Sequence, residues 1–125
     1  ELARARYADA EQALRGAREA LEAQRRLEIV GILDIALAAC VAATGRPEAW
    51  RERFDAGRNA LSSTGFVYVD VAWAAERAAE HAPTLTDRID ALELAAAQWQ
   101  ALGRGDDASR VRSAIAQQID GGVRG

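Results

Sequence analysis

The chain has 125 residues, enough for a single domain with a sizeable buried core. Its formal net charge of −3 and its pI near 5.2 argue against a dedicated nucleic-acid binder, which usually presents a basic face. No cluster of four or more arginines is free of acidic residues, so an anionic membrane surface is a poor partner too.

Residues 1–24 predict an amphipathic helix. Apolar residues recur along one face at alternating steps of four and three, and charged residues occupy the other faces. The same seam is typical of coiled coils, where its alanines would allow close approach, so a homodimer contact is an alternative to packing within the domain. The seam consists of Ala3, Tyr7, Ala10, Leu14, Ala17 and Leu21.

Residues 26–44 predict a second helix that is apolar nearly all round and therefore lies in the centre of the fold. Its most apolar run, IVGILDIALAACVAA, covers 29–43 and contains Asp34. A membrane-spanning helix needs roughly 20 apolar residues, so this run predicts a buried helix and no membrane partner.

Asp34 interrupts this apolar helix and allows two interpretations. It shares a stripe with Gly31, Ala38 and Val41. One interpretation is a core charge that is paired with an arginine or caps another helix. The other is a polar anchor in a groove, where Gly31 and Ala38 leave room for a ligand chain.

The segment Thr44-Gly45-Arg46-Pro47 ends the second helix and begins the third. Glycine suits the left-handed position after a helix, and proline suits the first turn of one. The third helix is expected over 47–62, where helical spacing predicts four buried residues: Trp50, Phe54, Gly57 and Leu61.

Residues 62–65, SSTG, break the helix, and FVYVDVAW follows as the one β-like stretch of the chain. A lone strand would lack a partner, because nothing else in the sequence predicts a strand. We therefore expect a fourth helix over 66–81 and no sheet, because a stripe with helical spacing runs through this segment: Val67, Val71, Ala74 and Ala78.

A second stripe on this helix combines aromatic and charged residues beside the core stripe: Phe66, Asp70, Trp73 and Arg77. Such residues are enriched at interaction hot spots. They also commonly cover the edge of a core, which is the alternative interpretation. These four residues and Asp34 are the candidate partner-binding residues.

His81-Ala82-Pro83 ends the fourth helix, and Thr84 with Asp87 three residues later fits a capping box. Helix five is expected over 85–102 and helix six over 107–119, in a single domain over 1–120 with a flexible tail over 121–125. The expected buried residues are Leu85, Ile89, Leu92, Ala96 and Trp99 in helix five and Ala108, Val111, Ile115 and Ile119 in helix six.

Between helices five and six, GRGD at 103–106 allows three interpretations. An adhesion site needs an exposed loop on a secreted protein, and nothing in the sequence indicates secretion. A phosphate-binding loop needs more glycine, a preceding strand, and a lysine, serine or threonine after it. We expect a turn, in which Gly103 ends one helix and Asp106 or Asp107 caps the next.

Cys40 and His81 are the only cysteine and histidine of the chain. Cys40 lies in the most apolar helix, where a cysteine is usually a small buried hydrophobe, and His81 at a helix end complements the helix dipole. With no Glu-x-x-His motif either, we expect no enzymatic activity, no metal site and no cofactor. A single cysteine also excludes an internal disulfide and favours the cytoplasm.

The turns GRPEA and GRGDDA have the same pattern, in which Gly-Arg ends an alanine-rich helix and an acidic residue and alanine open the next. Trp99, Leu102 and Gly103 also spell W-x2-L-G. These motifs, within 26–62 and 84–120, resemble the tetratricopeptide repeat. The resemblance implies an array of α-hairpins whose concave side binds peptides or protein segments. Since Asp106 replaces the tyrosine of that pattern, the array is expected to be irregular.

The sequence therefore predicts an all-α fold of about six antiparallel helices, arranged as an α-hairpin array or a small helical bundle. Its 30 alanines and its lack of lysine are typical of a GC-rich coding sequence, which favours a bacterial source. The function that fits best is a non-catalytic protein–protein interaction module of a larger bacterial protein, which docks a peptide or helix on its helical faces. The alternative is a helical dimerisation or small-ligand-sensing bundle.

Overall fold

The computed structural model describes residues 2–65 and 67–124, and it confirms the all-α fold. The described part contains six α-helices and no strand, and the 3-10 turn Pro47–Ala49 leads into the third helix. The helices are α1 (Leu2–Ala23), α2 (Leu27–Ala43), α3 (Trp50–Thr64), α4 (Val69–Glu80), α5 (Leu85–Ala101) and α6 (Gly105–Arg124).

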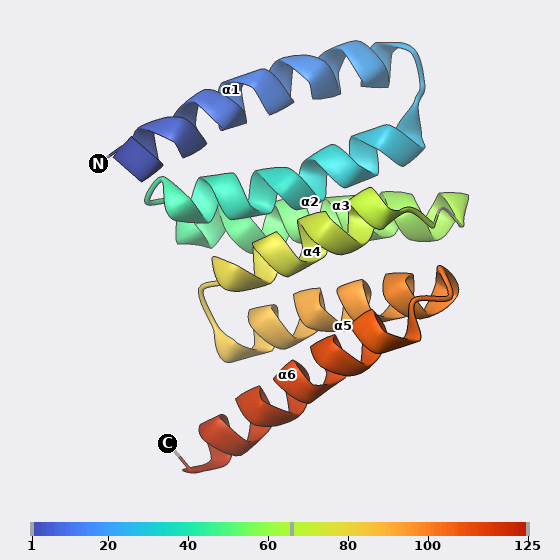
Figure 1. Cartoon of the computed structure of the whole chain (residues 1–125). Coiled ribbons are helices and arrows are strands. Elements are labelled where there is room, and N and C mark those ends of the chain that lie inside the picture. Colours follow the sequence, from blue (N-terminus) through green and yellow to red (C-terminus); the bar gives the residue numbers. More distant parts are fainter. Residues whose placement is uncertain (1, 66, 125) are drawn as a thin grey trace.

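The helices stack from α1 at one end to α6 at the other, and successive helices run in alternating directions (Figure 1). The second helix is central, as its apolar composition predicts, because α2 packs against α1, α3 and α4. In the other half of the stack, α5 packs against α4 and α6. The fold is therefore a small antiparallel bundle.

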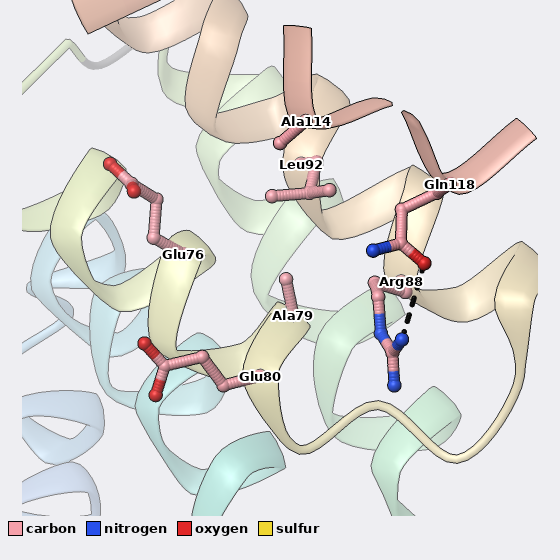
Figure 2. A pocket seen from close by; sticks show the side chains of 7 residues that line it. All are labelled: Glu76, Ala79, Glu80, Arg88, Leu92, Ala114 and Gln118. Atoms are coloured by element: carbon pink, nitrogen blue, oxygen red, sulfur yellow. Dashed lines mark hydrogen bonds between the residues drawn. The ribbon is translucent and has the colours of Figure 1, made fainter. Parts of the chain in front are cut away.

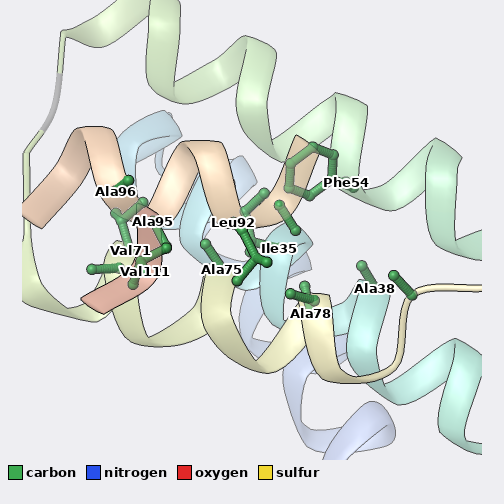
Figure 3. Packing of buried hydrophobic residues seen from close by; sticks show 14 of the residues in the cluster. Ile35, Ala38, Phe54, Val71, Ala75, Ala78, Leu92, Ala95, Ala96 and Val111 are labelled. Carbon is green, nitrogen blue, oxygen red and sulfur yellow. The ribbon is translucent and has the colours of Figure 1, made fainter. Parts of the chain in front are cut away.

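The hydrophobic core combines many alanines with a few large side chains (Figure 3). Trp50 and Phe54 stack with their ring centroids 4.8 Å apart, and Trp99 is 1% exposed. Because a methyl group takes little space, alanine faces let neighbouring helix backbones approach closely. The inward faces of α4 and α5 are lined by Ala72, Ala75, Ala78, Ala79, Ala91, Ala95 and Ala96.

Most of the buried positions expected from helical spacing are confirmed, including all four in α3. Three are wrong, because Val67, Leu85 and Ile119 are 39%, 40% and 48% exposed. The first precedes α4 and the second is the first residue of α5, so neither is covered by a neighbouring helix. The third lies in the last part of α6, beside Gln118, which bonds to Arg88 of α5, but its own side chain is not covered by a neighbouring helix. The flexible tail over 121–125 stays a prediction.

The connection from α3 to α4 differs from the expected one. Gly65 ends α3 in the left-handed region, with a φ of 65°, and its amide donates to the carbonyl of Leu61. Tyr68 is extended, so α4 begins at Val69, three residues later than expected. The buried face of α4 is consequently rotated from the predicted stripe and consists of Val71, Ala72, Ala75, Ala78 and Ala79.

Three helix ends share the turn known as the Schellman motif. Gly45 and Gly103 occupy its left-handed position, with φ angles of 91° and 75°. Gly103 therefore ends α5 in a turn, as expected, but α6 begins at Gly105, so Asp106 and Asp107 lie inside its first turn and the expectation that one of them caps it is wrong. In each turn the following amide donates to the carbonyl five residues earlier: Arg26 to Leu21 at 2.9 Å, Arg46 to Val41 at 2.8 Å, and Arg104 to Trp99 at 2.8 Å.

Arg25 occupies the same left-handed position in the turn from α1 to α2, with a φ of 57°. A residue with a side chain pays roughly 1–2 kcal/mol of folding free energy to adopt this conformation. Glycine avoids this cost, but its more flexible unfolded state offsets part of the gain. We expect Arg25→Gly to raise the free energy of unfolding by up to about 1 kcal/mol in urea denaturation. The control Ala23→Gly, at the last helical residue, should lower it instead. Loss of stability in both variants would contradict the prediction.

The helices α2 and α3 approach each other closely at two glycines. A methyl group at Gly57 would lie 2.7 Å from the carbonyl oxygen of Gly31 and 2.8 Å from the side chain of Ile35. Real Cβ atoms do not approach other atoms so closely, so a hydrogen atom is the only side chain that fits at this crossing. The glycine of α3 is thus a packing requirement, which its place on the predicted buried stripe indicates.

Candidate functional site

A groove of about 290 Å³ lies between α1 and α4 and has α2 as its floor. The volume is at the lower limit of small-molecule sites, roughly 300–1,000 Å³, and suits single side chains of a partner. Its lining is largely apolar: Tyr7, Ala10 and Leu14 of α1, Ala36, Ala39 and Cys40 of α2, and Trp73, Ala74 and Arg77 of α4.

Trp73 lines this groove and is 60% exposed. Its ring packs edge-on against Trp99, with the centroids 6.1 Å apart, so one part of the indole is supported by the core while much of it faces outward. Helical spacing predicts that Trp73 lies outside the buried face of this helix, and the structure agrees. An exposed tryptophan beside an apolar groove is typical of an interaction surface.

Arg77 lines the groove one turn further along α4. It pairs with Glu80 at 3.3 Å, and both side chains are 59% exposed. Such exposed pairs contribute little to stability, so the guanidinium can readily exchange partners. Asp70 is exposed one turn before Trp73, outside the groove lining. Phe66, the fourth residue of the predicted stripe, lies outside the described residues.

Asp34 is not part of this groove. It is 1% exposed, and its Oδ1 accepts hydrogen bonds from Arg18 at 2.7 Å and from Arg53 at 3.4 Å. The space that Gly31 leaves is filled by Leu61 and the backbone of α3. Asp34 is therefore a core charge paired with arginines that joins α1, α2 and α3, which was the first of its two interpretations.

A tyrosine–histidine contact joins α1 to the end of α4 beside the groove. The hydroxyl of Tyr7 and Nε2 of His81 are 2.9 Å apart, and the two rings meet edge-on with centroids 5.0 Å apart. Sequence reasoning assigned Tyr7 only to an apolar seam and His81 only to a helix end. The contact could not be predicted because these residues lie 74 positions apart.

The face of α1 toward α2 is partly charged. Tyr7, Leu14 and Leu21 of the predicted seam are half-buried, whereas its members Ala10 and Ala17 are exposed. The one buried side chain described in α1 is instead that of Glu11, 6% exposed. Burial raises the pKa of this carboxyl, but hydrogen bonds from Arg15 and Arg46 outweigh it and leave the pKa below its ordinary value.

Cys40 contributes to the floor of the groove and is 5% exposed. Burial, with a smaller contribution from Glu11, raises the pKa of its thiol. Because the thiolate is the nucleophilic form, a thiol with a raised pKa is poorly suited to covalent catalysis. The role that the structure supports for Cys40 is a small apolar surface.

Among the described residues, no helix is both long and apolar enough to cross a membrane. The same part of the chain contains no group of three or more His, Cys, Asp or Glu side chains that could hold a metal ion. Comparisons of the chain with protein-family models, with curated proteins and with solved structures found no match.

Proposed function

We propose that the chain is a non-catalytic protein–protein interaction module of a larger cytoplasmic bacterial protein. It docks an amphipathic peptide segment of its partner in the groove between α1 and α4. The observation that carries the proposal is Trp73, which is 60% exposed beside a groove with a floor of small apolar residues. An apolar side chain of the partner packs against the indole, and an acidic residue of the same segment pairs with Arg77.

The proposal includes the likeness to tetratricopeptide repeats. What supports it is the turn that the hairpins α2–α3 and α5–α6 have in common, with a left-handed glycine followed by arginine. Arrays of helical hairpins present continuous grooves between helices, and amphipathic segments bind such grooves through apolar anchors at helical spacing.

A displayed library of random peptides, selected on the wild-type chain, supplies a segment with which to test the groove. We expect selected peptides to combine apolar residues with an acidic residue. Such a peptide should bind Trp73→Ala at least about 30-fold more weakly, a loss of about 2 kcal/mol, because the truncation removes a wall of the groove. Isothermal titration calorimetry measures the difference.

The matched control is Ile119→Ala, which removes an apolar side chain that is 48% exposed on α6, outside the groove. This variant should bind the peptide like the wild type. The stability of Trp73→Ala should change only slightly, because exposed truncations usually cost about 0.5 kcal/mol or less. Unchanged affinity with a large loss of stability would make Trp73 a core residue and remove the groove as a docking site.

A helical dimer is the second candidate, and one observation favours it. α1 packs mainly against α2, and a stripe of exposed alanines at helical spacing runs along it: Ala10, Ala13, Ala17 and Ala20. A second copy of the helix can approach such a face closely. Light scattering over a wide dilution range separates the two candidates, because a dimer changes its mass on dilution and a monomeric docking module does not.

A further inference from the structure

A second pocket, of about 400 Å³, lies between α4, α5 and α6. This volume is within the usual range of small-molecule sites, roughly 300–1,000 Å³. The apolar part of its lining comes from Ala79, Leu92 and Ala114. Figure 2 shows Arg88 and Gln118 on one side of these residues and two acidic side chains of α4 on the other.

Arg88 is only partly satisfied by the fold. Its Nη1 donates to Oε1 of Gln118 at 3.2 Å. Its Nε is buried without a hydrogen-bond partner, and no other buried side-chain nitrogen or oxygen of the described residues is in that state. None of the carboxylates described in the structure pairs with this guanidinium. A partly buried cation without a counter-ion is unfavourable, and an anionic ligand would relieve that cost.

The two acids that line the pocket are engaged elsewhere. Glu76 accepts hydrogen bonds from Arg110 at 2.7 Å and from Trp99 at 2.8 Å, and the bond from Arg110 is the main cause of its lowered pKa. Glu80 pairs with Arg77. Neither acid therefore neutralises Arg88. Their negative charges make the pocket unfavourable for a dianion such as phosphate.

We propose that this pocket binds a small monocarboxylate with an apolar body. The carboxylate pairs with Arg88, and the apolar body covers Ala79, Leu92 and Ala114. Arginine suits this role because its planar guanidinium presents several donors to one carboxylate. A single negative charge matches one unpaired cation beside two acids. The site is separate from the groove beside Trp73 and does not depend on peptide docking there.

Nuclear magnetic resonance titration tests this proposal with three probes. The first is 4-methylpentanoate, the second is its neutral analogue 4-methylpentanamide, and the third is N-acetylglycylleucine, which offers a peptide C-terminus. We expect a carboxylate probe to shift the amide signals of Leu92, Ala114 and Gln118, and the amide probe to leave them unchanged. Tighter binding of the first probe points to a free acid, and tighter binding of the third points to a peptide C-terminus.

The deciding variant is Arg88→Gln, which should weaken binding of the carboxylate at least about tenfold, because it removes a charge-assisted hydrogen bond. Arg112→Gln is the matched control, since Arg112 is exposed, bonds to Gln100 and lies outside the pocket. It makes the same change in net charge and should bind like the wild type. If Arg88→Gln does not fold, Ala114→Leu tests the same pocket by filling its apolar part.

Three results would overturn the proposal. These are equal binding of the carboxylate and the amide, equal affinity in Arg88→Gln and wild type, and no signal change with either carboxylate probe. The peptide-groove experiment with Trp73→Ala is unaffected by any of them, so the two proposals fail independently.

Discussion

Replacing Trp99 by alanine is expected to lower the free energy of unfolding by roughly 3–5 kcal/mol. The indole is 1% exposed, supports Trp73 from beneath and lies under the guanidinium of Arg104, 5.0 Å from ring centroid to Cζ. Its removal leaves a cavity between α4 and α5 and takes one hydrogen-bond donor from Glu76. Urea denaturation followed by circular dichroism measures the loss.

Two further variants divide this effect into its parts. Trp99→Phe keeps most of the apolar volume but loses the N–H group that donates to Glu76, so a smaller loss of about 1–3 kcal/mol is expected. Trp73→Ala removes the exposed partner of the ring pair and should cost far less than Trp99→Ala. An unchanged unfolding midpoint for Trp99→Ala would show that the face of α5 is assigned incorrectly.

Gly57→Ala is expected to destabilise the protein by about 1–3 kcal/mol, although alanine normally favours a helix over glycine by about 1 kcal/mol. The added methyl group would lie 2.7 Å from the carbonyl oxygen of Gly31. That atom belongs to the backbone of α2, so relief requires the two helices to move apart. The separation would also disturb the stacked rings of α3. Thermal unfolding measures the loss.

Gly16→Ala provides the matched control for this crossing. A methyl group at Gly16 meets nothing within 4 Å, and the residue lies in the middle of α1. The helix preference of alanine should therefore act alone and raise stability by up to about 1 kcal/mol. The two glycine substitutions are expected to have opposite signs. A stabilising Gly57→Ala would contradict the close contact between α2 and α3.

Features that depend on neighbours in sequence can be predicted from the sequence. The glycine turns after α2 and α5 follow from the left-handed geometry that glycine alone adopts cheaply. The N-cap of α5 is confirmed, since the hydroxyl of Thr84 accepts from the amide of Asp87 at 3.1 Å, while the carboxylate of Asp87 accepts from Arg51. The buried stripe of α3 can also be predicted from helical periodicity, because all four of its members are buried: Trp50, Phe54, Gly57 and Leu61.

Features that depend on how neighbouring helices are placed cannot be predicted in this way. Ile119 has the spacing of a buried residue, but its side chain is 48% exposed although the adjacent Gln118 bonds to Arg88 of α5. Of the candidate site residues, the structure brings Trp73 and Arg77 to one groove and places Asp34 in an ion pair instead. The role of Arg88 could not be predicted from the sequence. Its pocket and its partner Gln118 depend on how α4, α5 and α6 pack together, and no local sequence pattern determines that packing.

The alanine faces of α4 and α5 do not by themselves fix where α4 lies along its own axis. Because one turn of methyl groups is much like the next, helices lined with them can shift along one another with little change in contact. Two indole N–H groups prevent such a shift: that of Trp50 donates to the carbonyl of Ala78 at 3.0 Å, and that of Trp99 donates to Glu76 at 2.8 Å. Each bond forms at a single axial position of α4. The position along the axis of α4 at which Trp73 and Arg77 face α1 is thus set from the interior, by the only polar side-chain atoms of two buried tryptophans.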